Sequence, residues 1–189
     1  MSVVDRVKAT LKIENMVAST SVGDYVDLVH AAELFEGAEY DPEHFSGVIV
    51  RLKEPSSTVL VFRSGKMVST GAKGYEIVED GIGRVVEALY GAGLIPEIVP
   101  YIQYKNIVFS ANLGVQLNMN KVALGLGLEN VEYEPDTFPG MVYRLFVPKV
   151  VILIFSTGRL VITGCKEYDD ALEALDIIVR DLEEMGILE

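Results

Sequence analysis

The sequence predicts an α+β fold made of two copies of one unit, each with an antiparallel sheet and helices covering one face of that sheet. Residues 40–55 (YDPEHFSGVIVRLKEP) match residues 133–148 (YEPDTFPGMVYRLFVP) at a constant spacing of 93, which reveals the duplication. Both copies have the same order of apolar patterns, and the turns between their strands are too short for the crossover helices of a parallel sheet. We place the copies at residues 1–95 and 96–189 of one pseudo-twofold domain, with ten strands in all.

Each copy is expected to begin with a strand, continue with a short helix and a run of strands, and end with an amphipathic helix. Turn residues separate the later strands at Pro55, Gly65, Pro148 and Gly158. The expected bounds of the first strand, the short helix and the closing helix are about 10–19, 24–35 and 75–90 in one copy, and about 101–110, 117–127 and 168–185 in the other.

The hairpins at residues 59–73 and 152–166 are apolar on both faces. Because side chains alternate along a strand, one face of the first hairpin carries Leu60, Phe62, Val68 and Thr70, and these recur as Leu153, Phe155, Val161 and Thr163. The opposite face changes from Val59, Val61, Met67 and Ser69 to Ile152, Ile154, Leu160 and Ile162. A face packed on the protein's own helices needs only the right apolar volume. A face identical in both copies therefore indicates contact with something that looks the same to each.

The charge is unevenly distributed along the chain. The net charge is −12, which ordinarily argues against a nucleic-acid partner, because phosphate binding depends on cationic side chains. Residues 47–73 and 140–166 nevertheless sum to +8, which leaves −20 for the remaining residues. The sequence thus allows a protein that is basic on one side and acidic on another.

Cysteine and histidine usage argues against a disulfide and against a metal site. Cys165 is the only cysteine, and with His30 and His44 it makes a poor set of zinc ligands, so we expect neither a metal nor another cofactor. The chain has no apolar stretch of signal-peptide or membrane-span length. We expect a soluble intracellular protein without a membrane partner.

Four motifs, each present in both copies, resemble those of the TATA-binding protein family. They are Asn followed by Met or Ile and Val, Phe-x-Gly-x-x-x-Arg-Leu, x-Leu-x-Phe-x-x-Gly-Lys/Arg, and Thr-Gly-x-Lys, and they span roughly residues 10–188. The resemblance implies a saddle, in which a curved antiparallel sheet places its concave face on the minor groove of A·T-rich promoter DNA and carries its helices on the convex face. This family is itself a standard example of minor-groove binding with apolar wedges. The short N-terminus and the acidic balance favour the archaeal type.

The resemblance also assigns roles to side chains on the duplicated face. The minor groove of A·T pairs offers only acceptors, so an apolar surface with a few donors suits it. An asparagine near a strand end is often only part of a turn, and a phenylalanine in a strand usually belongs to the core. Against those readings, the minor-groove contacts implied are Asn15, Val17, Leu60, Val68, Thr70, Asn106, Val108, Leu153, Val161 and Thr163, and the implied wedges are Phe45, Phe62, Phe138 and Phe155.

The basic residues and one acidic loop complete the implied site. Solvation alone is the preferred interpretation for Lys53, Arg63 and Lys149, and solvation also accounts for most acidic loops. The phosphate contacts implied are Arg51, Lys66, Lys73, Arg144, Arg159 and Lys166, and the contacts to transcription initiation factor B are Glu132, Glu134 and Asp136.

The resulting hypothesis is a non-enzymatic transcription initiation factor that binds and bends promoter DNA and recruits factor B and, indirectly, RNA polymerase. It would work in the archaeal cytoplasm on the nucleoid, or in the nucleus if the source is eukaryotic. The alternative is a duplicated α+β scaffold whose apolar face binds a protein or a lipid-like ligand. A homodimer that covers the apolar face of the free protein is left open. An enzyme is the weakest hypothesis, because the phosphate-loop and dinucleotide spacings are absent and no nucleophile and base form a pair.

Overall fold

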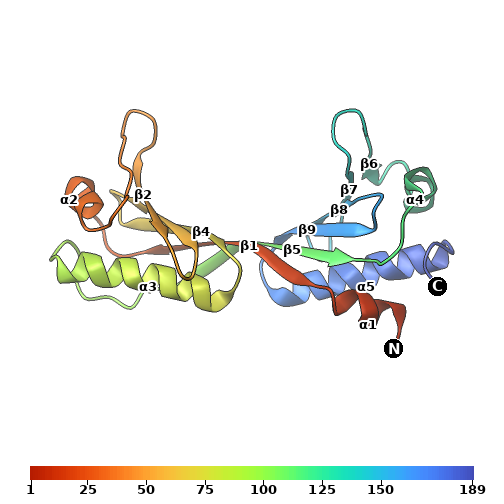
Figure 1. Ribbon diagram of the computed structural model, residues 1–189, viewed down its shortest axis with the longest axis horizontal. Helices are drawn as coiled ribbons and strands as arrows, with labels where there is room; N and C mark the ends of the chain where they lie inside the picture. Colours follow the sequence, from red (N-terminus) through yellow and green to blue (C-terminus); the bar gives the residue numbers. More distant parts are fainter. The chain divides into compact units, whose positions relative to one another are not determined.

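The computed structural model describes residues 1–189 and consists of two compact units (Figure 1). The first-repeat unit is Asn15–Lys105, and the second-repeat unit is Met1–Glu14 together with Asn106–Glu189. The units therefore do not follow the boundary between the sequence repeats, because the N-terminal residues pack with the second copy. None of the helices is long and apolar enough to cross a membrane.

The first-repeat unit contains an antiparallel sheet with the strand order β2-β3-β4-β1. Helix α3 is amphipathic and lies against β3 and β4 (Figure 1). Its buried side carries Val78, Ile82, Val85 and Leu89. The elements are β1 (Lys12–Ser21), α2 (Leu28–Glu33), β2 (Gly47–Leu52), β3 (Ser57–Phe62), β4 (Lys66–Ala72) and α3 (Tyr75–Gly91).

The second-repeat unit contains an antiparallel sheet with the strand order β5-β9-β8-β7-β6. Helix α5 covers this sheet as α3 covers the other, and it buries Leu175, Ile178, Val179 and Leu182. The elements are α1 (Val3–Lys8), β5 (Gln103–Asn112), α4 (Met119–Leu126), β6 (Val131–Glu132), β7 (Met141–Arg144), β8 (Val151–Ile154), β9 (Arg159–Cys165) and α5 (Tyr168–Glu184).

The α+β class is confirmed, but the expected ten strands are wrong, because the structure has nine. The missing strand belongs to the first-repeat unit. There Glu39 and Ile49 form a single bridge, with N···O distances of 3.0 and 2.8 Å, at the position where β6 pairs with β7 in the other unit. One bridged residue pair is too short to form a strand.

The helices also differ from expectation at the chain's N-terminus and in the short helix of each copy. Helix α2 begins only after Asp27, whose carboxylate accepts bonds from the N–H groups of Val29 and His30, and it is therefore shorter than predicted. Helix α1 was not predicted from the sequence. This helix lies beside α5 (Figure 1). Lys8 and Asp176 form an ion pair of 2.7 Å between the two helices, and Val7 is buried.

Alternation along the hairpins is confirmed in both units. The residues predicted to face the helices are fully buried, and the residues predicted to be shared by both copies are only half-buried. The fully buried set is Val59, Val61, Met67, Ser69, Ile152, Ile154, Leu160 and Ile162. The core of each sheet therefore lies on the helix side.

Two buried hydroxyls distinguish the core of the first-repeat unit. Ser57 and Ser69 are buried with no hydrogen-bond partner for their hydroxyl groups, and the aligned residues of the other copy are Val150 and Ile162. A hydroxyl removed from water without a partner costs about 1–3 kcal/mol. This core is therefore less stable than its sheet pattern alone predicts.

We predict that Ser69→Ala raises the free energy of unfolding by about 1 kcal/mol, because it removes an unpaired buried polar group. Thermal unfolding measures this as a rise in Tm of roughly 2–4 °C. Ser110→Ala is the matched control, because the Ser110 hydroxyl donates to Glu14 at 2.6 Å and its loss should not stabilise the protein. An unchanged or lowered Tm for Ser69→Ala would contradict the assignment.

Candidate nucleic-acid interface

We call the sheet face opposite α3 or α5 the open face of its unit. Residues directly opposite each other on neighbouring strands share a face, and Leu60 lies opposite Val68 as Leu153 lies opposite Val161. The predicted apolar and hydroxyl contacts are thus brought together within each unit. The half-buried set is Val17, Leu60, Val68 and Thr70 in one unit, and Val108, Leu153, Val161 and Thr163 in the other.

A β-bulge shapes the open face of each unit. Met16 pairs with Ala72 and Ala18 pairs with Ser69, so β4 has one more residue than β1 between these pairs. Gly71 lies within the bulge at a φ of 81°, a backbone conformation that suits glycine. The second-repeat unit repeats the arrangement, with the pairs Ile107–Cys165 and Phe109–Ile162 and a φ of 91° at Gly164.

The two predicted asparagines are held by these bulges. The Oδ1 atom of Asn15 accepts the backbone N–H of Gly71 at 2.7 Å, and Oδ1 of Asn106 accepts the N–H of Gly164 at 2.7 Å. The Nδ2 atom of Asn106 lies 3.4 Å from the Thr163 hydroxyl, to which it donates. In both side chains the carbonyl oxygen is occupied. The NH₂ group of Asn15 keeps both hydrogens for an external acceptor, and that of Asn106 keeps one.

The four predicted wedges form two ring pairs. Phe45 and Phe62 meet edge to face with centroids 5.7 Å apart, and Phe138 and Phe155 do the same at 6.0 Å. Phe45 is 37% exposed and Phe138 is 41% exposed, whereas a core phenylalanine such as Phe109 is fully buried. Each pair is therefore only partly covered by the protein.

Gly47 and Gly140 explain the glycine in the Phe-x-Gly motif. A Cβ atom on Gly47 would lie 3.0 Å from the Phe62 ring and 3.1 Å from the Phe45 ring. A Cβ atom on Gly140 would lie 2.7 Å from the Phe138 ring. Glycine therefore lets the two rings approach each other across the strand.

Two of the predicted phosphate-binding arginines form ion pairs with acids that the sequence analysis did not connect to them. Arg51 lies 2.6 Å from Glu39, and Arg144 lies 3.5 Å from Glu132. Both acids and both arginines occur at the repeat spacing of 93 residues. That shared spacing was the signal that could have revealed the pairs. A phosphate would have to compete with a carboxylate at each arginine.

A third arginine has an acid beside it on the open face. The Glu14 carboxylate accepts the Ser110 hydroxyl at 2.6 Å and lies 3.8 Å from Arg159. Ser110 lies opposite Val161, which places the Glu14 carboxylate among the open-face residues. Sequence analysis missed this acid, although it directly precedes Asn15.

The predicted lysines lie at strand ends. Lys66 begins β4 and is exposed, and Lys73 and Lys166 follow β4 and β9 and are also exposed. Lys149, for which solvation alone was preferred, lines the same groove as Asn106. The second-repeat unit therefore has one more cation near its open face than was assigned to it.

Comparison with known proteins decides which family has this arrangement. A family model described as "Transcription factor TFIID (or TATA-binding protein, TBP)" matches residues 10–92 and 101–185, which is most of the chain. The chain belongs to this family. The TATA-box-binding protein of Natronomonas pharaonis is 53% identical over 182 residues, which cover 96% of this chain and 97% of that protein.

Other relatives agree with this assignment. The TATA-box-binding protein of Archaeoglobus fulgidus is 46% identical over 178 residues, which cover 94% of this chain and 97% of that protein. The solved structure of Methanococcus jannaschii TBP superimposes with a TM-score of 0.85 at 45% identity, and covers 92% of this chain and 98% of that one. The resemblance drawn from the motifs is confirmed, and it is consistent with a protein that is not an enzyme.

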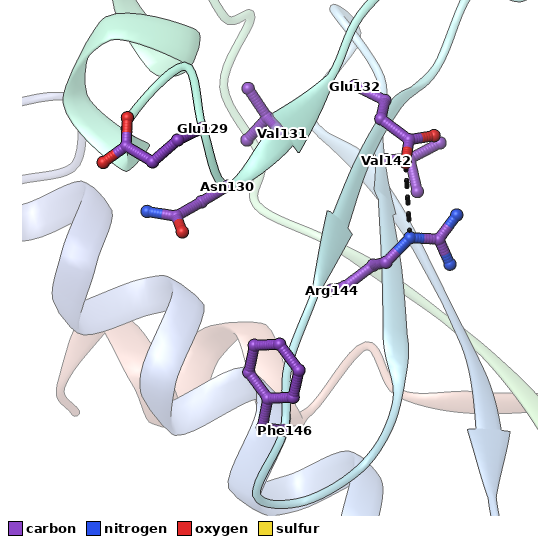
Figure 2. Close-up of a pocket in the computed structure, with 7 residues that line it drawn as sticks. All are labelled: Glu129, Asn130, Val131, Glu132, Val142, Arg144 and Phe146. Carbon is purple, nitrogen blue, oxygen red and sulfur yellow. Dashed lines mark ion pairs between the residues drawn. The ribbon is translucent and has the colours of Figure 1, made fainter.

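The acidic residues predicted to contact factor B lie at the β6 end of the sheet in the second-repeat unit. Glu132, Glu134 and Asp136 are all exposed. Figure 2 shows Glu132 joined to Arg144 across a pocket that Phe146 borders from the turn after β7. Sequence analysis missed Phe146, which is 87% exposed. The signal that could have revealed its exposure is the charged residue Lys53 at the aligned position of the first copy.

Cys165 lies on the helix side of its sheet and is fully buried. Burial, helped by the negative charge of Asp170, raises the pKa of the thiol to about 12. No group of three or more histidine, cysteine, aspartate or glutamate residues could hold a metal ion. The thiol is therefore a packing group and a poor nucleophile.

We predict that a thiol reagent such as a dinitrobenzoate disulfide does not modify the folded protein near neutral pH and modifies it fully in denaturant. The raised pKa also means that the thiol contributes stability below about pH 9, the ordinary thiol value, and that this contribution is lost as the pH rises toward about 12. Modification of the native protein as fast as that of the unfolded chain would contradict the burial of Cys165.

Proposed function

We propose that this protein is a general transcription initiation factor that binds the minor groove of A·T-rich promoter DNA with the open faces of its two units. The observation that carries the proposal is the duplicated open face, in which both copies hold an asparagine amide by its oxygen, next to half-buried valine, leucine and threonine side chains. The names of the TATA-box-binding relatives support the same function.

The chemistry of the groove fits these side chains. At A·T pairs the floor of the minor groove has only the adenine N3 and thymine O2 acceptors, whereas guanine adds an amino donor. Apolar side chains have no polar groups that would be left without a partner against such a floor. The amides of Asn15 and Asn106 donate hydrogen bonds to its acceptors. A guanine amino group would instead meet a donor or an apolar surface.

The phenylalanine pairs supply the wedges. Phe45 with Phe62, and Phe138 with Phe155, would enter base steps at the two ends of the site and bend the DNA. Partial unstacking costs a few kcal/mol for each step, and the bent duplex offsets this cost by contacting more protein surface. The edge-to-face stacking within each pair keeps both rings in place for entry.

The cations fix the register on the duplex through phosphates. Arg51, Arg144 and Arg159 would exchange their carboxylate partners for phosphate oxygens, and Lys66, Lys73 and Lys166 would add contacts at the strand ends. We further propose that Glu132, Glu134 and Asp136 receive transcription initiation factor B, which brings RNA polymerase to the promoter.

One experiment separates this function from the alternative of an apolar-ligand or protein-binding scaffold. Binding is measured by fluorescence anisotropy on a short A·T-rich duplex and on a G·C-rich duplex of the same length. Tight binding that is specific for the A·T-rich duplex is expected. Equal or absent binding to both duplexes would favour the scaffold, whose open faces would then serve a protein or a lipid-like ligand.

We predict that Phe62→Ala and Phe155→Ala weaken specific binding and reduce the bend measured by energy transfer between dyes at the duplex ends. Their Tm values should change little, because both rings lie outside the helix-side core. Phe109→Ala is the matched control. Because this ring is fully buried, its removal should lower the free energy of unfolding by about 3–5 kcal/mol. If Phe62→Ala leaves the bend unchanged and greatly lowers the Tm, Phe62 is a core residue and not a wedge.

We predict opposite effects of two charge changes on the salt dependence of binding. Six phosphate contacts give a log-log slope of about −5, and Lys66→Ala should flatten it by about 0.9. Glu14→Gln should tighten binding at low salt and steepen the slope, because Arg159 then has no competing carboxylate. If neither change alters the slope, these side chains do not face phosphate, and the proposed cationic rim is wrong.

A further inference from the structure

The hydrogen bonds behind each asparagine have a fixed direction. A backbone N–H can only donate, so the asparagine atom that faces Gly71 or Gly164 must be the carbonyl oxygen Oδ1. A side-chain amide has one acceptor end and one donor end. The glycine N–H therefore forces the NH₂ group of Asn15 and of Asn106 to face the other way.

In the second-repeat unit the direction passes on to a second side chain. Asn106 Nδ2 lies 3.4 Å from Thr163 Oγ1, and because Nδ2 can only donate, the threonine oxygen is the acceptor. The Thr163 O–H is then free to donate outward. In the first-repeat unit no protein acceptor binds the Asn15 NH₂ group, so both of its hydrogens remain available.

The glycine N–H points at the asparagine because of the bulge. Gly71 and Gly164 have φ values of 81° and 91°, which residues with a Cβ rarely adopt. A Cβ atom on Gly71 would meet no atom within 4 Å, so glycine is required at this position by its backbone angle and not by lack of space. The same bulge occurs in both units.

We infer that Gly71 and Gly164 are positioning residues whose N–H groups fix the Asn15 and Asn106 amides as donors toward the bases and thereby set the preference of each open face for A·T pairs. This inference rests on the proposed minor-groove function. Asn15 and Asn106 contact the bases, and the glycines act through them. A reader of the reverse polarity, with oxygen outward, would instead accept the amino group of guanine.

The test compares two duplexes that differ by one minor-groove amino group. One has adenine and the other has 2-aminoadenine, paired with thymine, at the central positions of an A·T-rich site. The wild-type protein should prefer the adenine duplex by about tenfold, as expected for one mismatched contact. Failure of the wild-type protein to bind the adenine duplex would reject the proposed function, not this inference alone.

Two variants then reverse the polarity in different ways. Asn15→Asp keeps the hydrogen bond to Gly71 and presents a second oxygen outward. The ratio of affinities for the adenine and the 2-aminoadenine duplex should therefore fall toward one or invert. Replacing Gly71 with glycolic acid exchanges its N–H for an ester oxygen, adds no charge, and releases the Asn15 amide to turn over. The same loss of preference is expected for this variant.

A matched ester at Gly93 is the control. Gly93 also has a positive φ, of 73°, and its N–H donates to the Tyr90 carbonyl at the end of α3, away from the asparagines. This control should lose a backbone bond without losing the preference for adenine. If the Gly71 ester binds and keeps the wild-type preference, the inference is wrong, whatever Asn15→Asp does. If the Gly71 ester does not fold, the equivalent ester at Gly164 decides by the same comparison.

Discussion

The extra residue in β4 and β9 is the constraint on which the two faces of each sheet depend. Strict alternation would place Ala72 on the same face as Val68 and Thr70. The bulge at Gly71 returns Ala72 to the helix side, where it pairs with buried Met16, and leaves Thr70 on the open face. The positive φ of Gly71 thus places Ala72 in the helix-side core and points the Gly71 N–H at the Asn15 side chain.

Acidic side chains partly neutralise the arginines near the open face of each unit. Arg51 and Arg144 are each paired with an acid from the adjacent bridge or strand, at the same place in both units. Exposed ion pairs of this kind contribute little to stability, about 0–1 kcal/mol. These pairs matter more for DNA binding. A carboxylate bound to the guanidinium holds the arginine side chain in place, and it reduces the binding free energy gained when the arginine contacts a phosphate.

Residue patterns predicted the fold class and the two faces of each hairpin, because alternation along a strand and the repeat can both be read directly from the sequence. The wedge assignment came from the family resemblance and stays a prediction. Residue patterns could not predict the bulges, since a register shift depends on how two strands pair, nor α1, whose contacts with α5 come from the other end of the chain. The tenth strand failed for a similar reason, because the pattern at residues 38–40 does not reveal that only Glu39 finds a partner.

The two copies diverge in a way that separates two kinds of constraint. The residue before each asparagine is Glu14 in one copy and Lys105 in the other, and Phe146 takes the position of Lys53, so part of the charge near the open face differs between the copies. The ion pairs of Arg51 and Arg144 are preserved. The valine, leucine and threonine positions are preserved. Phosphates line every duplex and can be contacted from many side chains, so individual charged residues such as Glu14 and Lys53 can differ between the copies. A groove floor of fixed acceptors leaves far fewer solutions, and the matched apolar and donor groups reflect that limit.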